Sequence, residues 1–69
     1  MFDERKFKAG MVLAGVSSKD LAHAMGIDES TLYRKLKNNG DFRRDEINIY
    51  IELCHPEDPH SIFFAEVDL

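Results

Sequence analysis

Between Val16 and Leu36 the chain repeats one pattern of apolar and polar positions after eleven residues. An apolar residue, a residue with a side-chain oxygen, three polar or charged residues and a leucine occur over 16–21 and again over 27–32. Ser17 and Asp28 are typical helix N-caps, because their oxygens accept the free N–H groups of a first turn. The apolar residues around them have the spacing of a hydrophobic staple. Two helices are therefore predicted, one starting after each cap.

The connection between these two predicted helices is short. Gly26 follows the first helix, and glycine adopts the left-handed conformation that ends many helices without a Cβ penalty. The pattern predicts helices over 18–25 and 29–38. The positions predicted to be buried on them are Leu21, Ala22, Met25, Leu32 and Leu36. Two helices so closely joined, over about 17–38, are typical of a helix-turn-helix, whose second helix normally enters the DNA major groove.

A further helix is predicted before this pair. It extends from Asp3 to about Ala14, and Gly15 closes it. Phe2 and Phe7 have the staple spacing around Asp3. The predicted buried stripe of this helix consists of Phe7, Gly10, Met11 and Ala14.

The segment 46–53 is compatible with two structures. Apolar and polar residues alternate along it, as in a strand. A helical stripe also fits, at Ile47, Tyr50, Ile51 and Cys54. We predict a helix, because a single strand would have no neighbour to pair with. Pro56 ends this helix, and Asp58-Pro59 predicts the start of a fifth one that runs through Phe64.

Length and composition narrow the class of protein. The 69 residues, 43% of them hydrophobic, suffice for one domain, 1–69, with a small core. The single cysteine cannot form an internal disulfide, and no apolar run approaches the roughly 20 residues that span a bilayer. The charged start, 1–5, lacks the apolar core of a signal peptide. We expect an all-α domain of five short helices in the cytoplasm, with no membrane association.

Charge is distributed unevenly along the chain, whose formal net charge is −4. Residues 1–17 have three basic side chains against two acidic ones, and residues 18–44 have six against four. Residues 45–69 contain seven acids and no lysine or arginine. A basic surface that attracts phosphates is therefore compatible with an acidic end, which lowers non-specific affinity.

The outer face of the helix 29–38 carries side chains suited to DNA bases. With Leu32 and Leu36 inward, steps of 100° per residue predict an outward position for Ser30, Arg34 and Lys37 and a flanking one for Thr31 and Tyr33. Arginine donates two hydrogen bonds to guanine, and hydroxyls bond to several base edges. Any exposed helix has polar residues, but the position in a doubly capped pair favours base contact. The predicted base-contacting residues are Ser30, Thr31, Tyr33, Arg34 and Lys37.

Other polar residues around this helix are candidates for phosphate contact. The predicted set is Ser18, Lys19, Lys35, Asn38, Arg43 and Arg44. The adjacent arginines after the Gly40 turn are the most specific signal, since a loop beside the helix reaches the neighbouring phosphates. Glu29 would repel phosphate, and we interpret it as a first-turn residue that favours the helix dipole.

Catalytic and metal chemistry find little support in the sequence. Cys54, His55 and His60 lack the paired spacing of a structural zinc site. No grouping of nucleophile, histidine and orienting carboxylate is recognisable, and no glycine-rich phosphate loop is present. His23 is interpreted as an exposed polar residue. We expect no enzyme activity and no cofactor.

An apolar block near the end, 62–64, suggests a contact surface. Ile62 and one of the two phenylalanines are expected in the core, and the other phenylalanine at a partner. The segment 67–69 is either a frayed end or a strand that pairs in a dimer. The residues predicted to contact a second copy or another partner are Ile62, Phe63, Phe64 and Val67. A dimer is expected, because one module of this size makes few DNA contacts.

The run KDLAHAMGIDESTLYRKLKNNGDFRRDEI, 19–47, resembles the lambda-repressor-like helix-turn-helix regulators of temperate phages and prophages, and among them the small Cro-like proteins. The likeness continues into the block at 62–65. It implies a repressor of transcription that binds operator DNA, with Ser18 at phosphate, 30–34 at bases and the loop near Arg43 at the backbone.

Two residue patterns depart from that family. Arg43 stands where threonine or serine is common before the fourth helix, and the chain is acidic where Cro-like proteins are usually basic. The acidity favours an alternative resemblance, to small phage proteins that act as antirepressors or modulators of repression. Such a protein would bind the phage repressor instead of DNA, through charge complementarity with a basic surface.

Overall fold

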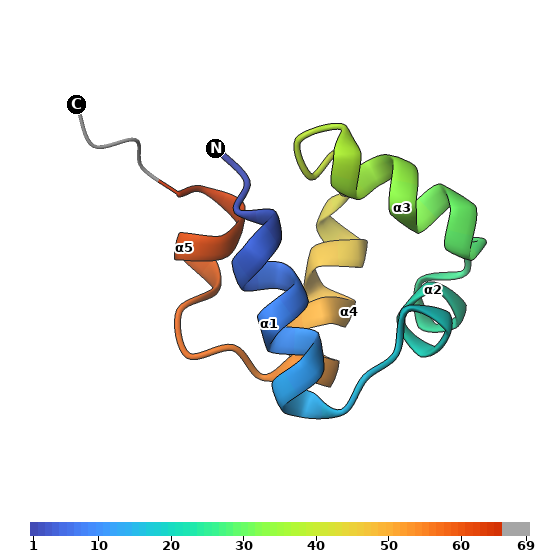
Figure 1. Cartoon of the computed structure of the whole chain (residues 1–69), viewed down its shortest axis with the longest axis horizontal. Coiled ribbons are helices and arrows are strands. Elements are labelled where there is room, and N and C mark those ends of the chain that lie inside the picture. The colour runs from blue at the N-terminus through green and yellow to red at the C-terminus, as the bar shows by residue number, and fades with distance from the viewer. Residues whose placement is uncertain (66–69) are drawn as a thin grey trace.

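The computed structural model describes residues 1–65, which form five helices. They are α1 (Glu4–Ala14), α2 (Ser18–Met25), α3 (Glu29–Lys37), α4 (Arg44–Cys54) and α5 (Pro59–Phe63). The helices α1 and α4 lie together at the centre, with α2 and α3 on one side and α5 on the other (Figure 1). The predicted all-α class with five short helices is confirmed.

Local capping explains where the first two helices begin and end. The Asp3 carboxylate accepts the N–H of Lys6, and the Ser17 hydroxyl accepts that of Asp20, each at 3.1 Å. Gly26 ends α2 with φ of 73°, the left-handed conformation that glycine adopts without strain. The predicted bounds of α2 are confirmed, and three residues connect it to α3.

Several details of the predicted helices need correction. Asp28 precedes α3, but its exposed carboxylate forms no capping hydrogen bond with the first-turn N–H groups. The helix α3 ends at Lys37, since the backbone of Asn38 is no longer helical, with ψ of 47°. For the same reason α5 ends before Phe64, whose φ is −132°. Ala14 is exposed instead of buried, because it is the last residue of α1, at the edge of the core.

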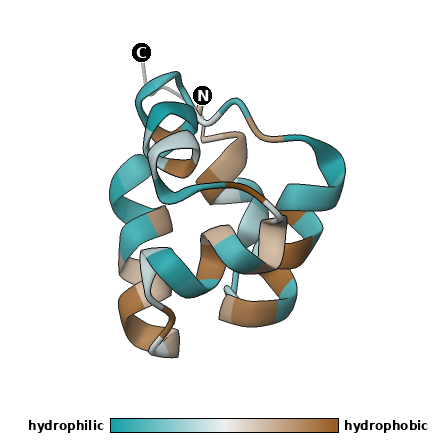
Figure 2. Cartoon of the chain, turned by 90° about the vertical axis from the view of Figure 1, so that its right-hand side faces the viewer, coloured by the Kyte–Doolittle hydropathy of each residue, from teal (hydrophilic) through white to brown (hydrophobic). Residues whose placement is uncertain are grey.

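The ambiguous segment 46–53 is helical, as predicted, and belongs to α4, which begins at Arg44. Tyr50 and Cys54 are buried on its inner face, and Ile47 and Ile51 are half-buried beside them. Apolar and polar residues alternate around the helices in Figure 2, as expected of short helices that bury one face.

An aromatic cluster holds the central helices together. The ring of Phe7 stacks on those of Tyr50 and Phe42, with centroids 4.2 and 5.3 Å apart. Phe63 of α5 meets the Tyr50 ring edge-on. The Tyr50 hydroxyl donates to the Phe7 carbonyl at 2.9 Å, so the one buried phenol in this cluster has a partner. The participation of Phe42 was not predicted from the sequence.

Candidate nucleic-acid interface

The face of α3 opposite the core is open to solvent. Leu32 and Leu36 are buried, so the turn of about 100° per residue directs Ser30 and Arg34 outward, and both are exposed. The Arg34 guanidinium forms no ion pair within residues 1–65. Thr31 is half-buried on the flank of the helix that faces the end of α2. Ser30 and Arg34 are therefore the two predicted base-contacting residues that the fold presents most directly.

Tyr33 and Lys37 are directed toward α1. The Lys37 ammonium lies 3.2 Å from the Glu4 carboxylate, which also binds Lys8 at 2.8 Å. Both ammonium groups lie over the Tyr33 ring, at 5.8 and 5.9 Å from its centroid. Hydrogen bonds from Lys8 and Lys37 lower the pKa of Glu4, and the bond to Glu4 raises the pKa of Lys8. Helical steps alone predicted Lys37 on the outer face, and its long side chain bends to a carboxylate instead.

Lys35 points to the opposite flank, toward α4. Its ammonium lies 3.0 Å from the buried carboxylate of Glu46 and 3.4 Å from the Asp41 carbonyl. The same Glu46 oxygen accepts the backbone N–H of Arg43 at 2.8 Å, while its other oxygen has no partner within residues 1–65. This network ties α3, the loop after it and the start of α4 together. Lys35 is thus held inside the fold, whereas the sequence predicted it at phosphate.

The predicted arginine pair lies where the loop after α3 meets α4: Arg43 is the N-cap of α4 and Arg44 is its first residue. Arg43 and Arg44 are exposed at the first turn of α4. The Arg43 guanidinium lies 3.6 Å from the exposed carboxylate of Asp45 and 3.7 Å from the buried carboxylate of Glu46, while the Arg43 side chain itself is 66% exposed. Asn38, at the end of α3, is exposed as well. These side chains surround the end of α3 and remain accessible to a ligand.

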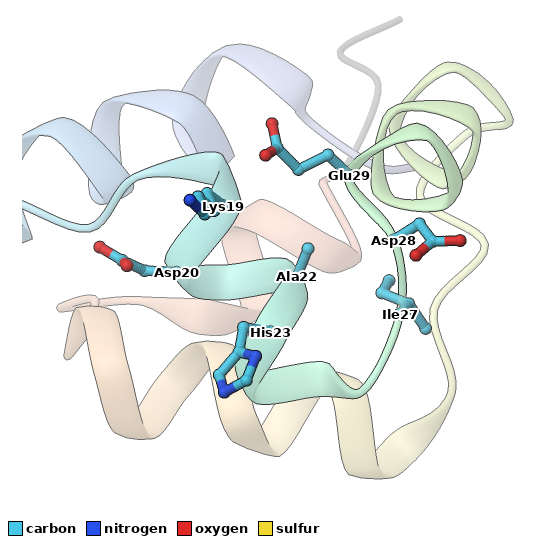
Figure 3. Close-up of a pocket in the computed structure, with 7 residues that line it drawn as sticks. All are labelled: Lys19, Asp20, Ala22, His23, Ile27, Asp28 and Glu29. Carbon is cyan, nitrogen blue, oxygen red and sulfur yellow. The ribbon is translucent and has the colours of Figure 1, made fainter.

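The start of α2 lies beside the start of α3. Ser18 and Lys19 are exposed in the first turn of α2. A shallow hollow separates this turn from Glu29, whose side chain extends over the α2 side (Figure 3). His23 is exposed on the same hollow, as predicted. The predicted phosphate contacts at 18–19 therefore have an acidic neighbour.

The predicted partner residues fall in different environments. Ile62 and Phe63 are buried, so they belong to the core and do not form the surface expected of them. Phe64 is 58% exposed. Val67 lies outside the described residues. Of the apolar block, Phe64 alone faces solvent.

The residues considered for a metal site differ in their exposure to solvent. Cys54 is buried against the core, which raises the pKa of its thiol, whereas His55 and His60 are exposed. Over residues 1–65 no three metal-binding side chains come together. None of the helices in this part of the chain has the length and apolar character needed to cross a membrane.

Three structurally important acidic and basic residues were missed from the sequence: Glu4, Lys8 and Glu46. The i, i+4 spacing of Glu4 and Lys8 is a signal for a helical ion pair. Glu46 occupies the third position of α4, where a carboxylate typically reaches back to the N-cap N–H.

No protein-family model, curated protein or solved structure matches the chain.

Proposed function

We propose that this protein is a sequence-specific DNA-binding transcriptional regulator, a Cro-like repressor of a temperate phage or prophage that acts in the cytoplasm. The observation that carries the proposal is the open outer face of α3, which presents Ser30 and Arg34. This helix follows α2 after only three residues. In the proposed complex α3 lies in the major groove, where Arg34 donates to guanine and Ser30 to a neighbouring base edge.

Phosphate contacts complete the proposed interface on both sides of α3. Ser18 and Lys19 contact the backbone from the start of α2, and Arg43 and Arg44 contact it from the start of α4. Lys35 is left out of this set, because Glu46 holds its ammonium inside the fold. The cations that remain are exposed, as phosphate contact requires.

Fluorescence anisotropy with the DNA upstream of the protein's own gene tests the proposal, against a random duplex of equal length. Arg34→Ala should weaken binding to the upstream DNA by about 1–3 kcal/mol and leave the random duplex almost unaffected. Arg43→Ala should weaken both. Lys6→Ala is the matched control, since Lys6 is an exposed cation that lines a groove between α1 and α5, away from α3.

If Arg34→Ala weakens binding to both duplexes equally, Arg34 contacts phosphate and not a base. If Arg34→Ala and Arg43→Ala both bind like the parent protein, α3 does not enter the groove.

Charge supports a second candidate, a modulator that binds the phage repressor. Two lysines of α3 are paired with carboxylates of the chain itself, and residues 45–69 contain seven acids. Such a surface complements a basic DNA-binding domain. A stoichiometric complex with the neighbouring repressor, together with no affinity for either duplex, would favour this candidate. Hydrogen exchange would then slow on α3 in the protein complex.

A further inference from the structure

The flank of α3 that faces α1 carries a compact group of charged and aromatic side chains, which we call the flank cluster: Glu4, Lys8, Tyr33 and Lys37. One carboxylate oxygen of Glu4 binds both ammonium groups. The Tyr33 ring lies under both, so it keeps the two lysines close to each other. The side chains of Lys8 and Lys37 are 46% and 61% exposed, respectively.

A hollow joins the flank cluster to the start of α2. Its lining includes Lys8 and Tyr33 from the cluster, and Ser17 and Ser18 from the N-cap and first residue of α2. The two lysines and the first turn of α2 therefore lie along the same side of α3. A polyanion that follows this side meets the free N–H groups of α2 and then the two ammonium groups.

We propose that Lys8 and Lys37 form a phosphate-binding site for the DNA backbone, which the Glu4 carboxylate occupies in the free protein. This inference rests on the proposed function, because it needs a duplex bound against α3. Carboxylate and phosphate oxygens accept the same charge-assisted hydrogen bonds from an ammonium group. Phosphate of the bound DNA therefore displaces Glu4 without any change in the fold.

Exposure decides which ion pair of α3 can be exchanged in this way. Pairs between exposed side chains are weak, because water screens the charges. The Lys35 side chain is only 19% exposed and that of Glu46 is fully buried, so separating them would leave this core carboxylate with only the Arg43 guanidinium, at 3.7 Å, as a charged partner. The Glu4 side chain is 29% exposed and its lysines are more so, so Glu4 releases them at less cost than Glu46 releases Lys35. The two flanks of α3 thus differ in function.

Binding to the upstream duplex and to a random duplex of equal length, measured over a range of salt concentrations, tests the site. Glu4→Gln should tighten binding to both duplexes by roughly two- to tenfold, since phosphate contact is independent of base sequence. Lys8→Met and Lys37→Met should each lower the slope of log Kobs against log salt by about 0.9, the value for one lost phosphate contact. Lys37→Arg should keep the slope.

Glu29→Gln is the matched control, because it removes the same charge from an exposed position on α3 that forms no ion pair within residues 1–65. The gain from Glu4→Gln should exceed that from Glu29→Gln and should vanish when Lys8 and Lys37 are both methionine. Circular dichroism checks that each variant is helical.

Two results overturn the inference alone: a parent protein that binds DNA with equal gains from both glutamine variants, or unchanged salt slopes after removal of the lysines. If the parent protein binds neither duplex at low salt, the proposed function fails, and the phosphate site fails with it.

Discussion

At the scale of single residues, two carboxylates determine which cations of α3 are available. Glu46 is 11 positions from Lys35 in the chain and Glu4 is 33 positions from Lys37, yet both pairs are formed. Helical steps predict correctly that Arg34 points outward, because a residue opposite two buried leucines has no other direction. They do not predict where a long lysine side chain ends, since that depends on carboxylates that only the folded chain brings near.

Tyr50 is the residue for which pH dependence follows most directly from the structure. Burial raises the pKa of its phenol above the ordinary value of 10.0. Between that value and the folded pKa, the native state holds a proton that the unfolded chain has lost. The stabilisation is therefore complete below about pH 10 and declines as the pH rises further.

Urea unfolding between pH 7 and pH 11 should show this decline in the parent protein. Tyr50→Phe should lower the free energy of unfolding by about 1 kcal/mol at pH 7, because it removes the hydrogen bond to the Phe7 carbonyl. It should also make the alkaline decline shallower. Tyr33→Phe is the control, since Tyr33 is 55% exposed. The same alkaline slope in both variants would contradict the assignment to Tyr50.

At the scale of elements, local signals determine where helices begin, and long-range contacts decide the ambiguous cases. The serine cap and the glycine end of α2 act within a few residues, so the pattern predicts its bounds correctly. The pattern of segment 46–53 fits a strand by its alternation and a helix by its apolar stripe. Its helical form buries Tyr50 against Phe7, which lies 43 positions away. Such a contact cannot be deduced from a local pattern.

The two predicted caps should differ in their contribution to stability. The Ser17 hydroxyl accepts an N–H of α2, so Ser17→Ala should destabilise the protein by about 1 kcal/mol. The carboxylate of Asp28 caps no N–H, so Asp28→Ala should cost clearly less. Urea denaturation of both variants at neutral pH checks this order. Equal losses would mean that Asp28 caps α3 in solution.

At the scale of the whole molecule, the two ends of the described chain meet beside α5. The backbone N–H of Ala65 donates to the Met1 carbonyl at 2.6 Å, and that of Asp3 to the Ile62 carbonyl at 2.7 Å. Met1 and Phe64, both largely exposed, therefore lie in neighbouring segments. Figure 1 shows this end of the molecule beyond α1, on the side opposite α2. Phe64 follows α5, which lies on the other side of α1 from α3.

We propose this surface as the contact of the predicted homodimer. Phe64 is the residue of the apolar block that can contact a second copy, because Ile62 and Phe63 are committed to the core. Phe64→Ser should therefore weaken self-association while leaving the free energy of unfolding of the monomer nearly unchanged. Sedimentation velocity should detect a dimer of the parent protein on a duplex with two half-sites one helical turn apart, and a larger monomer fraction for the variant.

Leu13→Ser separates this surface from another exposed apolar position, on α1. Leu13 is 89% exposed on α1 and lines a groove with Cys54 and Pro56, so a dimer formed there would be lost in Leu13→Ser and retained in Phe64→Ser. Retention in both variants would place the contact elsewhere. A parent protein that is monomeric both free and on DNA would contradict the two-fold operator, since each module would then have to bind its half-site with its own contacts alone.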